Sequence, residues 1–295
     1  MKKFLALDIF LTFVLFIWGA IVRTQGAGLA CPDWPLCHGK LIPPFEIPIL
    51  LEWGHRLLAS CVGFLTIGIC VVILKSKEYR ARLGRLSVIT LFLLVLQVVL
   101  GAIVVKFLLK PWLVAVHLGV ALVFLILLMT LFFEISGIGY DGLAWRTQSG
   151  FSRWRFSLAA WRDLVFIQII LGGYVGASHA GLACPDFPKC LGEWIPPLLS
   201  EPVAIHFFHR FIAYVLLVWI GISYVVARKT ISTPQFQNAL AALLGMVLFQ
   251  IVLGVTNVLA SLPTIIRVAH LGVATMILAM AVVIHYKVRR DARLS

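Results

Sequence analysis

Four histidines recur at matched positions along the chain and are its clearest candidates for chemistry. His55 and His117 belong to the first half of the sequence, and His209 and His270 belong to the second half. Each lies within an apolar run, one to two helical turns from its start, or roughly 5–10 Å along a helix axis. A neutral imidazole binds metal without placing a charge in an apolar environment. The sequence therefore predicts four imidazoles at one depth, each on its own helix.

The expected chemistry of these imidazoles is haem binding. One histidine on each of two facing helices is the arrangement that binds the iron of a planar macrocycle from both sides. The expected pairs are His55 with His117 and His209 with His270. Two alternatives remain: imidazoles that only bond neighbouring helices, and zinc, which usually takes four ligands where each half offers two.

Three arginines lie close to these histidines in the sequence. Arg56 and Arg210 each follow a paired histidine directly, and Arg267 precedes His270 by three residues. A guanidinium group binds a carboxylate through two parallel hydrogen bonds. We expect all three to bind haem propionates; the alternative is that they only extend their charge to the membrane surface.

One titratable position distinguishes the two halves. Glu52 precedes His55 by three residues, so both side chains share a helix face, whereas the equivalent position of the second half holds His206. A carboxyl group beside a haem could accept or supply a proton; the alternative is an interfacial glutamate that faces water. We therefore predict that Glu52 is catalytic, that the first half is reactive, and that the second half holds a resident cofactor.

These side chains must be positioned by apolar helices. The chain of 295 residues is 61% hydrophobic with a mean hydropathy of +1.02, which is more apolar surface than a soluble domain of this size can bury. Only a bilayer solvates such a surface, and 18 or more consecutive apolar residues read as a spanning helix. The sequence predicts an all-α integral membrane protein with eight transmembrane helices, at about 5–22, 49–74, 86–107, 112–135, 162–178, 203–227, 238–258 and 265–286.

The basic residues predict the orientation of these helices. The net charge of +13 does not indicate nucleic-acid binding, because the charges lie in short segments between apolar runs, where topology signals belong. We expect a bacterial cytoplasmic membrane protein with both termini in the cytoplasm and long outer loops at about 23–48 and 179–201. The expected cytoplasmic basic residues are Lys2, Lys3, Lys75, Lys77, Arg80, Arg82, Arg85, Arg146, Arg153, Arg155, Arg162, Arg228, Lys229, Lys287, Arg289, Arg290 and Arg293.

An internal repeat divides the chain. GAIVRTQGAGLACPD at 19–33 matches GGYVGASHAGLACPD at 172–186, and QVVLGAIVV at 97–105 matches QIVLGVTNV at 250–258. Each half has an even number of spans, so the copies have the same orientation, as in parallel transporter repeats. The sequence predicts two tandem pseudo-symmetric four-helix bundles: an N-terminal half at 1–135, a cytoplasmic linker at 136–161 and a C-terminal half at 162–295.

Each long outer loop contains two cysteines. The motifs CPDWPLC and CPDFPKC predict the disulfides Cys31–Cys37 and Cys184–Cys190, since an outer loop is an oxidising setting. Whether either pair is structural or redox-active stays open. Cys61 and Cys70 lie in the second span and are expected to be buried packing thiols.

The E-x-x-H-R motif at Glu52–Arg56, the matched histidines, the C-P-D-W-P-x-C loop and the four-plus-four layout together resemble haem A synthases, over essentially the whole chain. The resemblance implies an oxidoreductase that converts a ring methyl of haem O into a formyl group through a hydroxymethyl intermediate. The product, haem A, is supplied to terminal oxidases.

The resemblance also implies residue roles. His209 and His270 correspond to the iron ligands of a haem b cofactor, and His55 and His117 to the site of the substrate haem, where we also expect Arg56. Glu52 corresponds to the essential glutamate of the family, and Cys31–Cys37 to its outer cysteine pair. The second pair, Cys184–Cys190, is not universal in the family, which leaves the role of both pairs open.

The expected partners are haem O, membrane lipid, haem O synthase and the terminal oxidase assembly machinery, with a homo-oligomer left open. Two other functions fit four membrane histidines: a dihaem b-type cytochrome in quinol electron transfer, and a haem-binding transporter or chaperone. Neither would produce a haem with a formyl side chain.

Overall fold

The computed structural model describes residues 1–137, 151–197, 200–231 and 233–291, and these residues are mostly helical. Eight of the helices are long and apolar enough to span a membrane, as the sequence predicts. They are α1 (Lys2–Thr24), α2 (Ile47–Lys75), α3 (Lys77–Lys106), α4 (Pro111–Ser136), α5 (Phe151–Ala177), α6 (Glu201–Thr230), α7 (Pro234–Leu259) and α8 (Thr264–Asp291), with a short 3₁₀ helix η1 (Ala180–Leu182) before α6.

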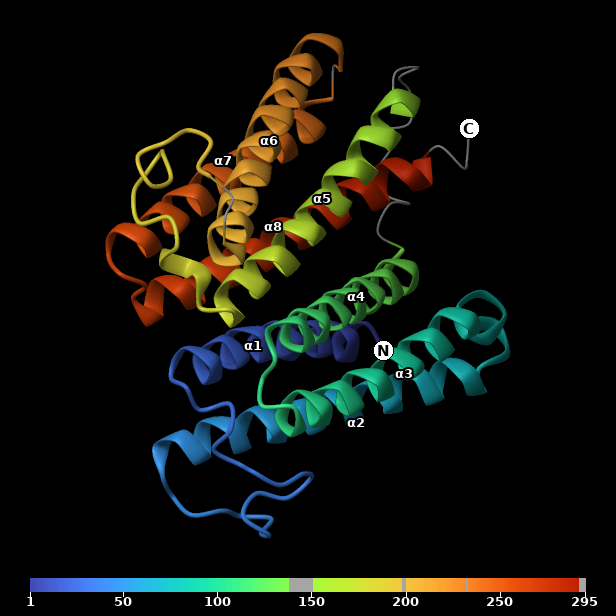
Figure 1. Cartoon of the computed structure of the whole chain (residues 1–295). Helices are drawn as coiled ribbons and strands as arrows, with labels where there is room; N and C mark the ends of the chain where they lie inside the picture. Colours follow the sequence, from blue (N-terminus) through green and yellow to red (C-terminus); the bar gives the residue numbers. More distant parts are fainter. Residues whose placement is uncertain (138–150, 198–199, 232, 292–295) are drawn as a thin grey trace. The chain divides into compact units, whose positions relative to one another are not determined.

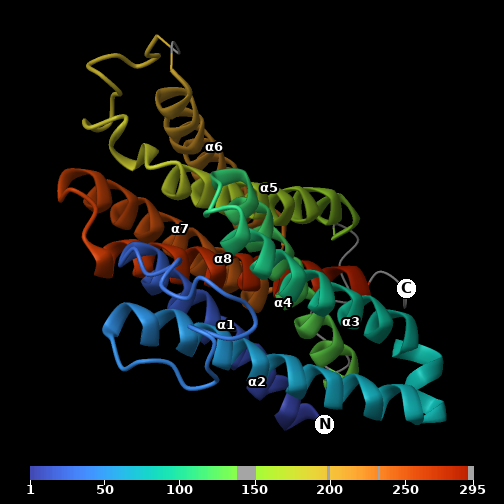
Figure 2. The same cartoon turned by 60° about the horizontal axis from the view of Figure 1, so that its bottom comes forward.

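Unit 1, Met1–Ser136, contains α1–α4. Each helix contacts the next along the chain and α4 also contacts α1, so the four close into a bundle (Figures 1 and 2). Its interior includes Leu5, Val62, Leu94, Leu128 and Leu131, each at most 8% exposed. We call the end of this bundle where α1 leads into α2 the loop end, because the disulfide-bearing segment lies there.

Unit 2, Gly137–Ser295, has the same helix order. Here α5 contacts α6, α6 contacts α7, α7 contacts α8, and α8 returns to α5. Ile220, Leu240, Leu243 and Leu278 are fully buried in its interior. Its loop end lies where α5 leads through η1 into α6.

Equivalent turns close both bundles at their loop ends. Leu109 and Leu262 have left-handed backbone conformations, with φ of 58° and 63°. Their backbone N–H groups donate to the carbonyls of Val104 and Asn257 at 2.9 and 2.7 Å, which ends α3 and α7. The side chains of the two leucines pack where Gly28 and Gly181 leave space. The long loop of each unit therefore packs against the turn that joins the last two helices of the same unit.

The start of α5 differs from the sequence expectation. The helix begins at Phe151, inside the segment 136–161 expected to be linker, and Phe156–Ala177 is long and apolar enough to span a membrane. Trp161 is 1% exposed and Trp154 packs edge-on against Phe236 with ring centroids 5.5 Å apart. The hydropathy pattern did not predict helix over residues 151–161, because hydropathy scales rank tryptophan as only weakly apolar although its indole ring buries a large surface. Residues 138–150 of the expected linker lie outside the described residues.

The expectation for the two cysteines of α2 was half right. Cys70 is buried, but Cys61 is exposed on the outer face of α2. The nine-residue separation places the two side chains on different faces of the helix.

Leu128→Ala in α4 should destabilise unit 1, because Leu128 is fully buried and its truncation leaves a cavity. We expect the free energy of unfolding to fall by about 2–5 kcal/mol, as it does for other buried leucines. The control is Val95→Ala in α3, a side chain 62% exposed on the outer face. Thermal unfolding in one detergent measures both, and equal melting temperatures for the two variants would contradict the assigned core.

Candidate functional site

Each histidine of unit 1 packs its ring against a glycine of the preceding helix. A Cβ atom added to Gly19 of α1 would lie 3.1 Å from Cε1 of His55 on α2. A Cβ atom on Gly101 of α3 would lie 3.4 Å from Cε1 of His117 on α4. Glycine is thus the residue that leaves space for the imidazole between adjacent backbones.

Unit 2 repeats both contacts more tightly. A Cβ atom on Gly172 of α5 would lie 2.8 Å from Cε1 of His209, and one on Gly254 of α7 would lie 3.2 Å from Cε1 of His270. The sequence analysis did not identify these four glycines as site residues. The signal was present, because each glycine lies inside a matched repeat segment, at the same separation in both copies.

The geometry of the second histidine pair fits a haem. The ring centroids of His209 and His270 lie 6.5 Å apart, with an angle of 65° between the ring planes. Two imidazoles bound to one iron from opposite sides, with N–metal distances of about 2 Å, would place their centroids about 6 Å apart. Both rings also have a buried Nδ1 without a hydrogen-bond partner among the described residues. The ring separation is therefore the observation that suits an iron bound by both imidazoles.

The first pair has a different hydrogen-bonding environment. His55 and His117 likewise have buried Nδ1 atoms that bond to none of the described residues. The amide nitrogen of Gln97 lies 3.2 Å from Nε2 of His117. In unit 2, by contrast, the side-chain amide of Gln250 donates to the backbone carbonyl of His270 at 3.0 Å and not to its imidazole ring. A ligand that binds Nε2 of His117 must therefore displace the Gln97 amide. A ligand of His270 does not have to displace Gln250.

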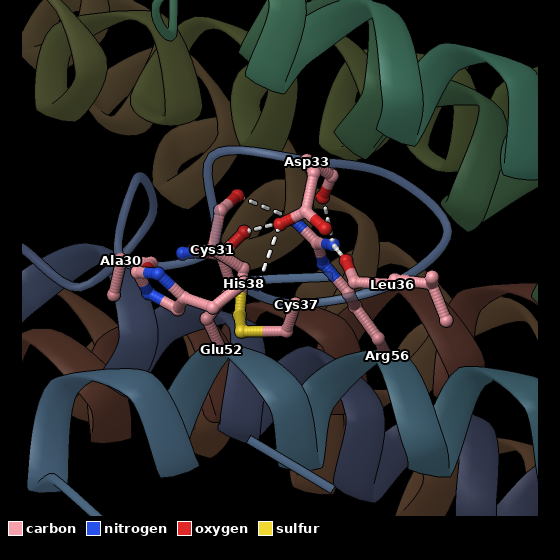
Figure 3. Close-up of polar contacts among 8 residues, drawn as sticks. All are labelled: Ala30, Cys31, Asp33, Leu36, Cys37, His38, Glu52 and Arg56. Carbon is pink, nitrogen blue, oxygen red and sulfur yellow. Dashed lines mark hydrogen bonds and ion pairs between the residues drawn. A yellow bond between two sulfur atoms is a disulfide. The ribbon is translucent and has the colours of Figure 1, made fainter. Parts of the chain in front are cut away.

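Glu52 and Arg56 hold the disulfide loop of unit 1 (Figure 3). Glu52 is 4% exposed; its Oε2 accepts from the backbone N–H of Cys31 at 2.8 Å, and its Oε1 pairs with Arg56 at 2.6 Å. Arg56 also donates to the carbonyls of Cys31 at 2.9 Å, Asp33 at 2.6 Å and Leu36 at 2.9 Å. One ion pair on α2 thus fixes the loop backbone, a role that the sequence analysis did not predict.

His206 takes the place of Glu52 in unit 2. The backbone N–H of Cys184 lies 3.3 Å from its Nδ1, and Nε of Arg210 lies 3.2 Å from its Nε2. Arg210 also donates to the carbonyls of Cys184 at 2.5 Å, Asp186 at 2.7 Å and Lys189 at 2.9 Å. A neutral imidazole has one acceptor nitrogen, so it can satisfy one of these two donors at a time. The carboxylate of Glu52 satisfies both and also neutralises its arginine.

The two loops share one internal structure. Disulfides join Cys31 to Cys37 and Cys184 to Cys190. The Asp33 carboxylate accepts from the backbone N–H groups of His38 at 2.6 Å and Gly39 at 2.7 Å. The bond from Gly39 is the main cause that holds the pKa of Asp33 below its ordinary value.

Asp186 has the same role in the second loop. It accepts from the backbone N–H groups of Leu191 at 2.7 Å and Gly192 at 2.8 Å. The bond from Gly192 is the main cause that lowers its pKa.

The three arginines expected at propionates occupy different environments. The guanidinium groups of Arg56 and Arg210 bind loop carbonyls, as described above. Arg267 is half-buried one turn before His270, and its side chain bonds to none of the residues that the structure describes. The position equivalent to Arg267 in unit 1 holds Val114. Arg267 is therefore the available guanidinium of the three, and it belongs to the unit whose histidine pair fits a haem.

The donor set does not favour a zinc-type site. In the described ranges, no group of three or more His, Cys, Asp and Glu side chains could hold a metal ion. A haem iron needs only two axial ligands from the protein, which each histidine pair provides.

The fold and the histidine arrangement define a class of protein, the multi-pass helical membrane proteins with paired imidazoles inside four-helix bundles. More narrowly, residues 2–282 match the model of the COX15-CtaA family of cytochrome oxidase assembly proteins, so the chain belongs to that family.

Several curated relatives are named heme A synthase. The protein of Symbiobacterium thermophilum is 29% identical over 266 residues, which cover 88% of this chain and 86% of the relative. The protein of Halalkalibacterium halodurans is 30% identical over 210 residues, with coverage of 70% and 68%. That of Alkalihalophilus pseudofirmus is 32% identical over 216 residues, with coverage of 70% and 69%.

Acid should loosen the loop of unit 1. Because the pKa of Asp33 is lowered in the folded loop, its contribution to stability is present above the unfolded value of about 3.9 and is lost as the pH falls through the folded pKa. Hydrogen-exchange protection of the His38 and Gly39 amides should therefore fall in acid. In Asp33→Asn it should already be low at neutral pH, while the loop held by Asp186 in the same molecule stays protected. Unchanged protection in the variant would contradict the assigned role of Asp33.

Proposed function

We propose that this protein is a haem A synthase, a membrane oxidoreductase that converts a ring methyl of haem O into the formyl group of haem A through a hydroxymethyl intermediate. The observation that carries the proposal is the pair of histidines in each unit, each given space by a glycine, in a chain whose relatives are named heme A synthase. Haem O is the substrate, and haem A would pass to terminal oxidases.

In this proposal unit 2 is the cofactor unit. His209 and His270 would bind the iron of haem b, as their 6.5 Å ring separation supports. Arg267 would bind a propionate, since its guanidinium is available one turn from His270. The haem, when bound, supplies one-electron redox chemistry. The protein contributes the axial ligands and their fixed orientation.

Unit 1 is proposed to bind the substrate. His55 and His117 would hold haem O between α2 and α4, with Gln97 turning away from the His117 ring. Glu52, one turn from His55, would accept a proton as the methyl group is oxidised. Arg56 would neutralise Glu52 and keep the disulfide loop over the site, and Arg210 would hold the second loop in the same way.

The proposal includes the orientation in the membrane. Both termini would lie in the cytoplasm and both disulfide loops outside a bacterial cytoplasmic membrane. The distribution of basic residues supports this orientation, as do two disulfides, which persist in oxidising compartments. Haem O synthase and the terminal oxidase assembly machinery are the proposed partners.

Glu52→Gln should abolish most haem A formation. Glutamine keeps the size of the side chain and an acceptor for the Cys31 N–H but cannot take the proton, and loss of a general base typically costs 10²–10⁴-fold in rate. The measurement is extraction of haems from membranes that supply haem O, followed by chromatography and mass analysis.

His206→Gln is the matched control, because the same substitution beneath the other loop should leave product formation largely intact. A normal haem A yield in Glu52→Gln would show that Glu52 only holds the loop and takes no part in proton transfer. Only unmodified haem from the wild type, despite ample haem O, would overturn the synthase proposal.

Gly254→Ala should weaken haem binding by unit 2, because the new Cβ would lie 3.2 Å from Cε1 of His270 and force the ring to move. Overpacking typically costs about 1–3 kcal/mol, or about 5- to 150-fold in affinity. The absorbance of bis-imidazole haem per purified protein measures the loss.

Gly245→Ala is its control on the same helix, since a Cβ there would meet nothing within 4 Å. Equal haem content in the two variants would argue against His270 as a ligand.

A further inference from the structure

A second group of polar side chains lies inside unit 1, far from the histidines. Asp8 precedes Gly19, which contacts His55, by eleven residues, so it lies roughly 16 Å farther along α1, away from the loop end. Asp8 is fully buried. A carboxyl group inside a membrane-spanning bundle is costly and is a functional candidate by default.

Among the described residues, one of the two Asp8 oxygens has a hydrogen-bond partner and the other has none. Oδ2 accepts from the hydroxyl of Thr66 on α2 at 2.7 Å. Oδ1 is buried and has no partner among the described residues. The hydroxyl of Thr12, one turn along α1, is also buried and unpaired within that part of the chain. The carboxyl group therefore has unused hydrogen-bonding capacity directed into the bundle.

The polar group extends across three helices. Cys70 lies one turn beyond Thr66 on α2 and interacts with Asp8 and with Ser87 of α3. Ser87 is fully buried, so its hydroxyl interacts with the Cys70 thiol inside the bundle and away from water. Hydroxyl groups can both donate and accept, so this row offers the hydrogen bonding that a proton or a small number of water molecules requires.

Unit 2 has apolar side chains at the equivalent positions. Counted along the repeat, Asp8 corresponds to Trp161, Thr66 to Ile220 and Ser87 to Leu240. These three side chains are at most 1% exposed, so they fill the same part of their bundle. The same fold can therefore be built here without a carboxyl or hydroxyl group, although Nε1 of Trp161 is buried and has no partner among the described residues. Packing thus does not explain the carboxyl group of unit 1.

We propose that Asp8 is a proton-binding site, in which its carboxyl group releases a proton to water at the end of unit 1 opposite the loop end and takes one up again. The step forms or breaks one O–H bond and needs no redox partner. This proposal rests on the proposed function and extends it, because the unit that oxidises haem O would then have an internal proton acceptor on the far side of the substrate.

The surroundings allow Asp8 itself to dominate the titration. From α2 it is faced by Thr66 and the Cys70 thiol, and from α3 by Ser87. The side chains of α4 in this core are apolar, including Leu128 and Leu131. Two of the charged groups at this end of the bundle have other partners: Lys2 donates to the carbonyl of Ser136, and Arg82 lies 3.6 Å from Glu134. Lys75, Lys77 and Arg85 are exposed to solvent.

Infrared difference spectroscopy between acid and alkaline buffer tests the proposal on the full-length protein in lipid. We expect a protonated-carboxyl C=O band that disappears with rising pH and is absent from Asp8→Asn. Thr66→Val keeps the carboxyl group but removes its hydrogen bond, so it should shift the band. Asp163→Asn, at an exposed position of α5, is the control that should leave the band unchanged.

Two outcomes would overturn the proposal. One is a band that is identical in wild type, Asp8→Asn and Thr66→Val. The other is a band that responds to sodium ions at fixed pH, which would make the group a cation site. If Asp8→Asn does not fold, the Thr66→Val shift decides the question alone.

A stability measurement separates a proton site from a structural hydrogen bond. Asp8→Leu combined with Thr66→Ile gives unit 1 the apolar character of unit 2, and it should melt no lower than the wild type, because a buried polar pair is often replaced without loss by apolar groups. A clear drop in melting temperature would assign Asp8 a structural role and overturn the proposal.

Haem A yield links the site to the reaction. In Asp8→Asn it should fall several-fold while the haem b content stays unchanged, and an unchanged yield would overturn the link. If the wild type makes no haem A, the proposed function fails, but the infrared result still decides whether Asp8 binds a proton.

Discussion

The close approach of neighbouring helices at four glycines is the constraint on which the site depends. Each imidazole packs against a glycine, most closely at Gly172, where an added Cβ atom would lie 2.8 Å from the His209 ring. An apolar bundle makes a free charge or an unpaired polar atom costly, which favours a neutral imidazole that can bind a ligand. Helix contact and histidine orientation are therefore parts of one arrangement, on which the proposed haem binding depends. The remaining elements, including the turns at Leu109 and Leu262, keep the helices at that separation.

The two units share one helical framework but differ in the side chain that lies beneath the disulfide loop. Both arginines hold a disulfide loop by three backbone carbonyls, yet the acceptor beneath the loop is a carboxylate in unit 1 and an imidazole in unit 2. A carboxylate satisfies both donors and carries a charge that Arg56 neutralises, so Glu52 serves the loop better than His206 does. Structural support and proton transfer are thus compatible roles for Glu52. The polar row around Asp8 is a second feature that unit 2 lacks.

Several functional assignments came from residue identity together with position. The repeat predicted that Glu52 and His206 occupy equivalent places, and the histidine pairing predicted two ligand sets. The guanidinium groups of Arg56 and Arg210 bind loop carbonyls, contacts that the sequence did not predict, and the assignment of these arginines to propionates stays a prediction. An arginine next to a histidine in sequence points to a different side of its helix, so adjacency could not show which group it binds. Arg267, one turn from His270, is the arginine whose side chain stays available.

The sequence by itself determined the helical membrane class, the eight spans and the internal repeat, because a bilayer imposes long apolar helices and a duplication preserves spacing. It also identified the loop cysteines as pairs, since both partners lie within one short loop. Only the tertiary structure decided which glycine faces which histidine, which groups Arg56 binds, and that Asp8 and Thr66 meet although 58 residues separate them. Those contacts join different helices, and their geometry depends on helix rotation and side-chain direction, which hydropathy and spacing do not specify.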